Sequence, residues 1–561
     1  MLDGVGLSLW HPRGDEFCAA WKCWVRCDGD EKVIKGFRQI AFLTTLSRVL
    51  GMVRDMTFAY FLGASGLMDG WAVAFKIPNL ARRLFGEGAA SSSLIPVYSE
   101  EYHKDKEKAN RLALSVVTVV FVLLIGMVLI GEGIIWIYYK FFAIYPGTRL
   151  KLVLSGIMLP YAVLICVAAV LSGILNAHRH FAMPAAAPVL LNILIIGALF
   201  LSGWVLRMEP QTQVFVLTVA VIFAGLTQLL VQFPPLWARG ISVRPAWDVK
   251  SEGFRKVMLL MGPMVLGLTA TQINTLADDL VALWFSGSAE KGSFFYFFGQ
   301  QVQYPMWEGA VSHLFYSQRL YQFPLGVFGI SLATAIFPVM SGDAARKDFS
   351  ALCKTISRGL RCSVFVALPA TVGLVLLSRP IVSAIFERGK FRTEDTALTA
   401  MTLSFYVLGL CGYFGQQVLT RAFYAVQDSA VPAKSAVAAV VMNVVLNLTL
   451  MWFLGTGGLA ASTALSSYLQ VVILGTALRR RLGRSILDGF MPAVLKTVVA
   501  TACMGVAVFI GLILMRSYGG LLKVLVAMPL GCGIYVLVAR LLRIEMLSLL
   551  TGGGDAKAMR A

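Results

Sequence analysis

The chain has 561 residues, of which 58% are hydrophobic and only 14% are charged, and its formal net charge is +19. A soluble domain carries roughly 25% charged residues, so a water-soluble globular protein is excluded and most of the chain is expected to lie in lipid. The positive charge lies mostly in short loops between apolar segments, which argues against a surface that binds nucleic acid.

The chain begins with a mixed polar segment, residues 1–36, that we expect to be a cytoplasmic tail. It has no short apolar stretch followed by a small-residue cleavage site, so it does not resemble a cleavable signal peptide. Fourteen apolar segments follow, and each is long enough for the roughly 20 residues that a membrane-spanning helix needs. They are residues 39–62, 68–98, 113–139, 152–176, 184–206, 213–236, 257–285, 312–340, 362–386, 396–424, 435–454, 458–478, 491–515 and 524–542.

The loops between these segments set the predicted orientation. With the N-terminus in the cytoplasm, the cytoplasmic segments hold roughly three times as many Lys and Arg residues as the loops on the other side. Removing any one span would invert all loops after it and destroy this asymmetry. The sequence therefore predicts an even number of spans with both termini in the cytoplasm.

Short internal matches predict that the chain is built from a repeat. Three segments of the first half match three segments of the second half in the same order: 53–63 with 277–287, 95–99 with 337–341, and 181–184 with 430–432. The matches also require an insert in the second half, and the aromatic stretch within 288–310 is the obvious one. Parallel repeats of this kind are a transporter architecture in which the substrate site lies between the halves.

The predicted fold is an all-α polytopic membrane protein with two six-helix lobes and a final helix pair. Its expected parts are the tail 1–36, an N-lobe 37–240, a C-lobe 241–480, a helix pair 481–545 and a cytoplasmic tail 546–561.

Ionisable residues inside the predicted spans are the strongest sign of function. The cations that do not lie near a span end are Arg48, Arg54, Lys76, Arg82, Arg83 and Arg319. Each Arg or Lys at the bilayer centre costs on the order of 2.5–3.5 kcal/mol, so those of the first two spans would together cost upwards of about 10 kcal/mol in lipid. We therefore expect them to face water, counter-ions or a ligand.

Helical geometry groups several of these cations with acids. Positions seven and eleven apart return to nearly the same angle on a helix, so one stripe of the second span holds Asp69, Lys76, Arg83 and Glu87, with Asn79 at its edge. Arg48 and Asp55 share a face of the first span in the same way. Pro78 and the glycines after it predict a bent or partly unwound second span.

These acids allow two interpretations of the cations. Asp55, Asp69 and Glu87 could neutralise them as buried ion pairs without any ligand. In the first two spans, however, five cations face three acids, and the surplus positive charge favours an anionic ligand. The planar fork of Arg matches phosphate best, and Arg319 from the other half could approach the same cavity.

The sequence offers little support for catalysis. Asp278-Asp279 resembles the magnesium-pyrophosphate motif of prenyl enzymes, but without a second acidic cluster we favour a role in ion coupling or helix pairing. No Walker sequence, Gly-x-Ser-x-Gly or His-Glu-x-x-His is present. We therefore expect a transporter that is not an enzyme and that has no cofactor and no metal site.

The charged spans also carry a family resemblance. Residues 47–55 (SRVLGMVRD) and 69–89, which include Phe75-Lys-Ile-Pro-Asn79, resemble the signature of the MurJ (MviN) family. Further matching segments are 174–192, 316–327 and 388–391. The resemblance runs from about residue 37 to residue 545.

The resemblance implies a function and a set of site residues. The family belongs to the multidrug/oligosaccharidyl-lipid/polysaccharide exporter superfamily and flips lipid II, the undecaprenyl-pyrophosphate-linked peptidoglycan precursor, outward. It implies that Arg48, Arg54, Arg82 and Arg319 face a central cavity and hold the pyrophosphate or the adjacent head group, with Asp69 and Glu87 as supporting acids. Periodicity alone prefers Arg83 to Arg82. The last two spans, 491–542, are implied to form a groove for the lipid tail.

Two features depart from the family pattern. The family often has Asp before the arginine of the eighth span, and here that position is Gln318, which puts an acidic partner for Arg319 in doubt. The aromatic insert 288–310 has no family counterpart, and it is expected in the periplasm either as an interfacial element or as a loop without function.

We therefore predict a lipid II flippase of the bacterial inner membrane that works by alternating access. Its expected partners are lipid II and membrane lipids, with other cell-wall synthesis proteins as further candidates. The alternatives are a flippase for another polyprenyl-linked glycan, an ion-coupled multidrug antiporter of the same superfamily, and a membrane glycosyltransferase. The antiporter would need an acidic or aromatic cavity, and the glycosyltransferase would need a catalytic carboxylate that only Asp278-Asp279 could provide.

Overall fold

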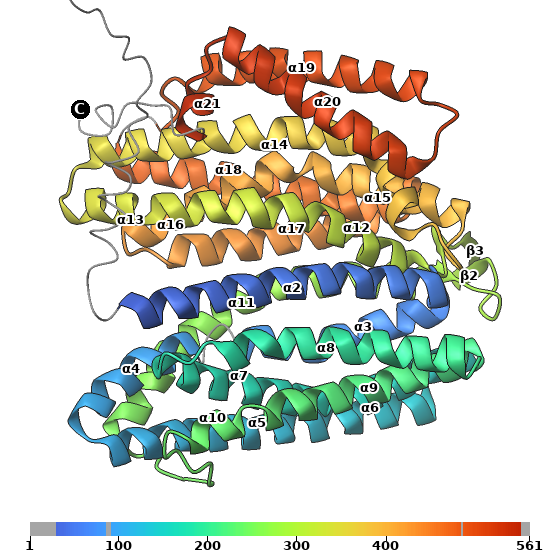
Figure 1. The fold of residues 1–561 in the computed structure, drawn as a ribbon. Helices are drawn as coiled ribbons and strands as arrows, with labels where there is room; N and C mark the ends of the chain where they lie inside the picture. The colour runs from blue at the N-terminus through green and yellow to red at the C-terminus, as the bar shows by residue number, and fades with distance from the viewer. Residues whose placement is uncertain (1–29, 86–90, 484–485, 551–561) are drawn as a thin grey trace, which may run out of the picture.

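Helices make up nearly all of the protein. The computed structural model describes residues 30–85, 91–483 and 486–550. Helices α2 to α10 form the first lobe, in the lower half of Figure 1. Their bounds are α2 Asp30–Leu62, α3 Gly66–Ala81, α4 Ser91–Lys104, α5 Lys106–Phe141, α6 Pro146–Met158, α7 Tyr161–Ala177, α8 Ala182–Phe200 with the π-helical turn η2 Leu201–Val205, α9 Pro210–Leu230 and α10 Phe233–Trp237.

The second lobe and a final helix pair follow, in the upper half of Figure 1 except for α11, which lies at the level of α2 in this view and reaches α4. The second lobe contains α11 Glu252–Trp284, α12 Ala310–Pro324, η3 Leu325–Ile330, α13 Ser331–Ala345, α14 Phe349–Phe386, α15 Thr393–Leu408, α16 Leu410–Ala425, α17 Ala430–Leu454 and α18 Thr456–Leu482. The pair consists of α19 Phe490–Leu514 and α20 Gly520–Leu541, which both pack on α14, and the short α21 Glu545–Leu550 comes last.

The predicted repeat is visible in the packing of the two lobes. In the first lobe α2 packs on α8, α3 on α6, α5 on α7 and α8 on α9. In the second lobe α11 packs on α17, α12 on α15, α14 on α16 and α17 on α18. These four contacts of the first lobe each have a counterpart in the second, and the predicted all-α fold with two repeated lobes and a C-terminal helix pair is confirmed.

Ten helices, some of them two segments joined end to end, are long and apolar enough to cross a membrane within the described residues. Helices α15 and α16 make an eleventh span if their 40° bend lies within one crossing. The first, second and seventh predicted spans correspond to α2, to α3 with α4, and to α11, which carry most of the ionisable residues discussed above. The class of membrane protein is confirmed, and the count of fourteen spans stays a prediction.

The second predicted span departs from a regular α-helix soon after its proline. Ser65 caps the start of α3 by accepting a hydrogen bond from the backbone N–H of Met68, and the helix carries Pro78 in its last turns. A π-helical turn over residues 82–85 follows α3, and regular α-helix resumes at Ser91.

The insert between α11 and α12 forms small β-structures. Strand β1 Ser286–Gly287 pairs in parallel with β4 Met306–Trp307, and β2 Phe294–Phe297 pairs antiparallel with β3 Gln300–Gln303. This insert lies at the same end of the molecule as the turn between α2 and α3 (Figure 1). We call it the outer end, because the predicted topology places it in the periplasm, and the opposite end the inner end.

Candidate functional site

A cluster of charged side chains joins the two lobes in the last third of α2. Arg54 donates from Nε and Nη2 to Oδ1 of Asp55 (3.0 and 2.8 Å) and from Nη1 to Oδ1 of Asn192 on α8 (3.0 Å). The carboxylate of Asp55 is almost fully buried. Arg54 is therefore oriented by one charged and one neutral acceptor of its own lobe.

Arg319 reaches the same carboxylate from the other lobe. Its Nε lies 3.5 Å from Oδ2 of Asp55, and its guanidinium lies over the ring of Phe315, 4.6 Å from the centroid. The side chain of Arg319 keeps 30% of its surface exposed. Two guanidinium groups from opposite lobes thus share one carboxylate, and this Arg54–Asp55–Arg319 cluster carries a net positive charge.

Gln318, which precedes Arg319 in the sequence, does not serve as a partner of Arg319 as the family pattern implies for this position. Gln318 is buried and donates from Nε2 to the hydroxyl of Tyr406 within the second lobe (3.1 Å). The acidic partner of Arg319 comes instead from α2, which the sequence alone did not reveal.

A second ion pair crosses between the lobes. Nζ of Lys76 on α3 donates to Oδ2 of Asp279 on α11 and to the backbone carbonyl of Thr275 (3.1 Å). Asp279 is buried, while the side chain of Lys76 is 24% exposed. The neighbouring Asp278 points into the second lobe, where it accepts hydrogen bonds from Asn447 (2.7 Å) and Thr463 (2.9 Å). The two adjacent acids thus have different functions, one between the lobes and one inside a polar network.

Asp69 lies away from these cations, at the outer end. It accepts hydrogen bonds from the backbone N–H of Gly309 (2.7 Å), the backbone N–H of Ser312 (2.7 Å) and the hydroxyl of Ser312 (2.6 Å). Gly309 and Ser312 are the N-cap and third residues of α12, so a buried carboxylate of one lobe caps a helix of the other. These contacts do not support the predicted role of Asp69 as an acid among the cations.

Glycine is required at this contact. Gly309 has a φ of +97°, and a Cβ there would lie 2.6 Å from the carbonyl oxygen of Ala64. The hydroxyl of Tyr316 donates to the carbonyl of Gly63 in the same turn (3.1 Å). Together with Asp69, these contacts hold the turn between α2 and α3 against the start of α12 and join the lobes at the outer end.

The remaining predicted cations are placed differently. Arg48 is exposed on α2. Nε of Arg82 donates to Oδ1 of Asn79 (2.9 Å), and Nη1 of Arg83 donates to Oε1 of Gln272 on α11 (3.2 Å). Arg83 therefore reaches α11, whereas this hydrogen bond of Arg82 is to a residue of α3. Glu87 lies outside the described residues.

The lobes are also bridged at the inner end, where α4 meets α11. Nζ of Lys256 donates to Oε2 of Glu100 (2.8 Å), and Nζ of Lys104 donates to Oε1 of the same residue (2.9 Å). These two ammonium groups lower the pKa of Glu100 to about 2. Glu100 is thus ionised at any physiological pH and pairs with a cation of each lobe.

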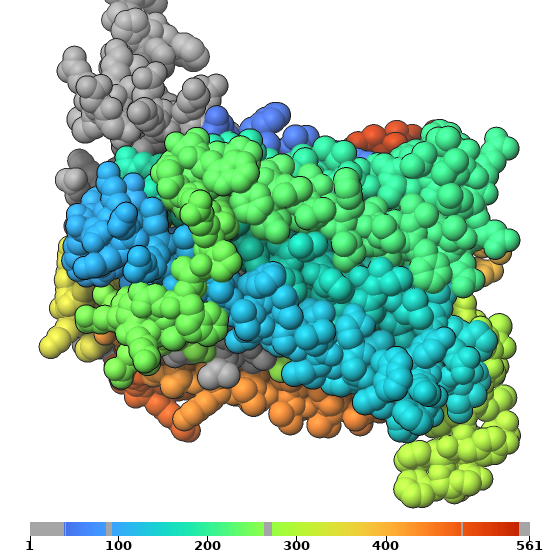
Figure 2. All heavy atoms as spheres, turned by 90° about the horizontal axis from the view of Figure 1, so that it is seen from below, coloured from blue at the N-terminus to red at the C-terminus, as the bar shows by residue number. Residues whose placement is uncertain are grey.

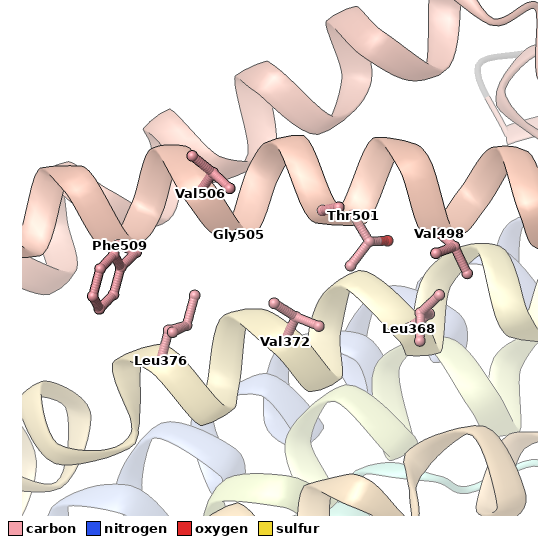
Figure 3. A pocket seen from close by; sticks show the side chains of 9 residues that line it. Leu368, Val372, Leu376, Val498, Thr501, Gly505, Val506 and Phe509 are labelled. Carbon is pink, nitrogen blue, oxygen red and sulfur yellow. The ribbon is translucent and has the colours of Figure 1, made fainter.

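The first helix of the C-terminal pair, α19, forms an apolar groove against α14 of the second lobe. The groove has a volume of about 500 Å³ and is lined by Leu368, Val372 and Leu376 of α14 and by residues of α19. Figure 3 shows these three side chains facing Val498, Thr501 and Phe509 across the gap. Almost all of the lining is apolar, so the groove is suited to a hydrocarbon chain.

Sequence reasoning missed three partners in the site. Asn192, Gly309 and Ser312 bind Arg54 or Asp69 through neutral groups. Asn192 was recognisable as a polar residue within an apolar span. Gly309 and Ser312 gave no such signal, because their role depends on which helix of the other lobe lies opposite.

The family model for the lipid II flippase MurJ matches residues 58–529 of this chain. A probable lipid II flippase MurJ of Vibrio cholerae is 33% identical over 86% of this chain and 89% of its own length. The lipid II flippase MurJ of Burkholderia cenocepacia is 30% identical over 79% of this chain and 83% of its own length.

Solved structures show the same fold. A lipid II flippase MurJ in an inward closed conformation superposes with a TM-score of 0.73 at 24% identity, over 91% of this chain and 99% of that protein. An inward-facing multidrug resistance transporter of the MATE family superposes with a TM-score of 0.59 at 15% identity, over 79% of this chain and 94% of that protein.

Proposed function

The chain belongs to the lipid II flippase MurJ family, and from this premise we propose that it moves lipid II across the bacterial inner membrane. The substrate is a polyprenyl pyrophosphate that carries a glycopeptide head group. The chain acts as a transporter without hydrolytic or ATPase chemistry, and its termini lie in the cytoplasm.

One observation carries the proposal. Arg54 and Arg319 come from opposite lobes and share the single carboxylate of Asp55, so the seam between the lobes has a positive charge that its own acid does not balance. A pyrophosphate placed between the two guanidinium groups would accept charge-assisted hydrogen bonds from both. Further contributors to the head-group site are Arg48, Lys76, Asn79, Arg82 and Arg83.

The transport step follows from the arrangement in two lobes. The contacts at the outer end, through Asp69, and at the inner end, through Glu100, both join one lobe to the other. Breaking one set while keeping the other opens the seam to one side of the membrane, which is alternating access. An anionic head group would then be driven outward by the membrane potential, by about 2.3 kcal/mol per charge at 100 mV.

The lipid tail takes a separate route. We assign the prenyl chain to the apolar groove between α14 and α19, which lies in the predicted part 481–545 and its neighbour α14. The proposal keeps the hydrocarbon in an apolar environment while the head group crosses between the lobes.

Asp278 supports a subsidiary proposal of ion coupling. It is buried among Asn447 and Thr463 within the second lobe, where a bound cation would compensate its charge. Asp279 is a weaker candidate for ion coupling, because Lys76 already neutralises it.

Other cell-wall synthesis proteins are further expected partners of the chain.

The test is complementation in cells depleted of their own lipid II flippase. Wild-type chain should restore growth, and Arg54→Ala and Arg319→Ala should not, at equal expression in the membrane. Lys354→Ala is the matched control, because this exposed cation of α14 lies outside the site. Failure of the wild type would reject lipid II as the substrate, and growth with both arginine variants would remove these residues from the mechanism.

Reconstitution separates lipid II from related substrates. Purified chain in vesicles should flip lipid II faster than a polyprenyl pyrophosphate with an unrelated glycan. Equal rates would favour the alternative of a flippase for polyprenyl-linked glycans in general. Transport of a lipophilic cation in exchange for protons or Na⁺ would favour the multidrug antiporter.

A further inference from the structure

The hairpin formed by β2 and β3 presents an unusual set of exposed aromatic side chains. Tyr296 is 78% exposed and Phe298 is 93% exposed. Phe294 and Phe297 are also exposed on the same strand and turn. Exposure of these side chains to water is unfavourable, because each large apolar side chain that stays in water loses the free energy that its burial would contribute.

The backbone at the tip supports a role for these side chains. Phe298 and Gly299 form the two-residue turn, and both have positive φ values, +47° and +78°. Asn or Asp usually occupies the first position of such a turn, because a bulky residue is strained in the left-handed region. A strained and exposed phenylalanine at a loop tip points to a binding function.

The hairpin is amphipathic from one strand to the other. Phe294 pairs with Gln303, Tyr296 with Gln301, and Phe297 with Gln300. One strand is therefore aromatic and the other is rich in amides. This combination suits a boundary between an apolar and a polar medium, where aromatic residues are enriched in membrane proteins.

The base of the hairpin packs against the helical body. Phe295 packs on Tyr304 (4.9 Å between ring centroids) and on Trp452 at the end of α17 (6.3 Å). The carboxylate of Glu290 accepts a hydrogen bond from the backbone N–H of Gly147 at the start of α6 (2.7 Å). The insert belongs to the second lobe and α6 to the first, so the hairpin base lies across the seam.

The hairpin lies at the side of the helical body, where the predicted spans face lipid. Figure 2 shows the hairpin standing out to the side of the helical body at the outer end, not beyond the other turns at that end. Next to its base, Trp452 ends α17 together with Phe453, which is 84% exposed. The aromatic tip thus continues the apolar, lipid-facing ends of the spanning helices.

We propose that residues 294–303 are a membrane anchor whose aromatic tip enters the interfacial region of the outer leaflet beside the seam between the lobes. The lateral position and the continuity with the helix ends favour a lipid surface over a protein partner, which a tip reaching away from the membrane would fit better. The anchor fixes the second lobe at the level of the bilayer where the seam meets lipid. It does not depend on which substrate the chain transports.

Photo-crosslinking with the full-length chain tests this anchor. The phenylalanine analogue p-benzoylphenylalanine replaces Phe298 or Tyr296, and the matched control carries it at Glu394, an exposed polar position after α14 at the same end. The variants are irradiated in nanodiscs of phosphatidylethanolamine and phosphatidylglycerol and in native membranes. Adducts are identified by mass.

The expected result is phospholipid adducts at both hairpin positions, several-fold above the control. Yields at the level of the control in nanodiscs would overturn the anchor. Adducts to a protein in place of lipid in native membranes would also overturn it and would identify a partner surface.

Discussion

Asp69→Asn is the sharpest test of how the outer end is held closed. The carboxylate accepts three hydrogen bonds from Gly309 and Ser312, and the residue is only 2% exposed. An asparagine keeps one acceptor oxygen, which can still serve Ser312. Its amide nitrogen would face the N–H of Gly309, so that one donor loses its partner.

The magnitude follows from these contacts. A hydrogen bond to a charged group contributes about 1.5–3 kcal/mol, and a buried donor without a partner costs about 1–3 kcal/mol. The neutral side chain regains part of this, because burying it costs less than burying a carboxylate. We expect the closed outer end to lose about 2–3 kcal/mol, which is about 30- to 150-fold in the equilibrium between joined and parted lobes.

The assay is a distance measurement by pulsed electron paramagnetic resonance. Nitroxides are attached through unnatural amino acids at Glu209 of the first lobe and Glu394 of the second, both exposed at the outer end. Asp69→Asn should increase the population with a long distance. Ser312→Ala, which removes only the hydroxyl donor and leaves no buried donor without a partner, should have a smaller effect of about 1.5 kcal/mol. An unchanged distance distribution in Asp69→Asn, or a larger effect of Ser312→Ala, would refute this account of the contact.

Three further predictions concern stability, each measured by thermal unfolding in detergent. Lys76→Met leaves buried Asp279 without its cation and should cost about 2–3 kcal/mol, less than a fully buried pair would because Lys76 is 24% exposed. Gly389→Ala should cost at least about 1–2 kcal/mol, since φ is +61° there and a Cβ would lie 2.4 Å from the carbonyl oxygen of Tyr60. Burial and a neighbouring arginine lower the pKa of His178 below its ordinary 6.5. The contribution of this residue to the free energy of unfolding is therefore fully present above pH 6.5, and it is lost below pH 6.5 because the unfolded chain takes up a proton there and the folded chain does not. His178→Gln should reduce the loss of stability between about pH 8 and 5.

Each of these predictions has a control. Asp279→Asn in the Lys76→Met background should recover most of the lost stability, and no recovery would contradict the ion-pair explanation. Gly373→Ala adds a Cβ that meets nothing within 4 Å and should not destabilise α14. A pH dependence that is the same with and without His178 would assign the acid loss to other groups.

The sequence was sufficient for the architecture because its signals are strong and repeated. Apolar segments of spanning length and the order of three short matches predicted two lobes of equal build, which the packing confirms. The sequence indicated that Arg319 from the second half could approach the cations of the first half, and the structure brings Arg54 and Arg319 to Asp55.

The sequence was less informative where a role depends on the opposite helix. Periodicity places Asp69 and Lys76 on one stripe of α3, but they lie two turns apart, and different helices of the second lobe face them: α12 near Asp69 and α11 near Lys76. The aromatic insert was recognised as a segment without counterpart, yet its pairing into a hairpin follows from the turn at Phe298-Gly299, which has no conventional hairpin sequence. The bend between α15 and α16 could not be predicted either, because no proline marks it in the sequence.

The carboxylate of Asp55, which Arg54 and Arg319 share, has a consequence for the step in which the empty transporter returns to its starting conformation. Two guanidinium groups approaching without cargo would repel each other, and an empty cavity could not close. Because Asp55 lies between the two arginines, it compensates part of their charge after the anionic substrate has left. The empty protein can therefore return to its starting conformation. In the proposed mechanism, the single charge of Asp55 is smaller than that of a pyrophosphate, so the substrate would gain from the positive charge of the two arginines that Asp55 does not neutralise.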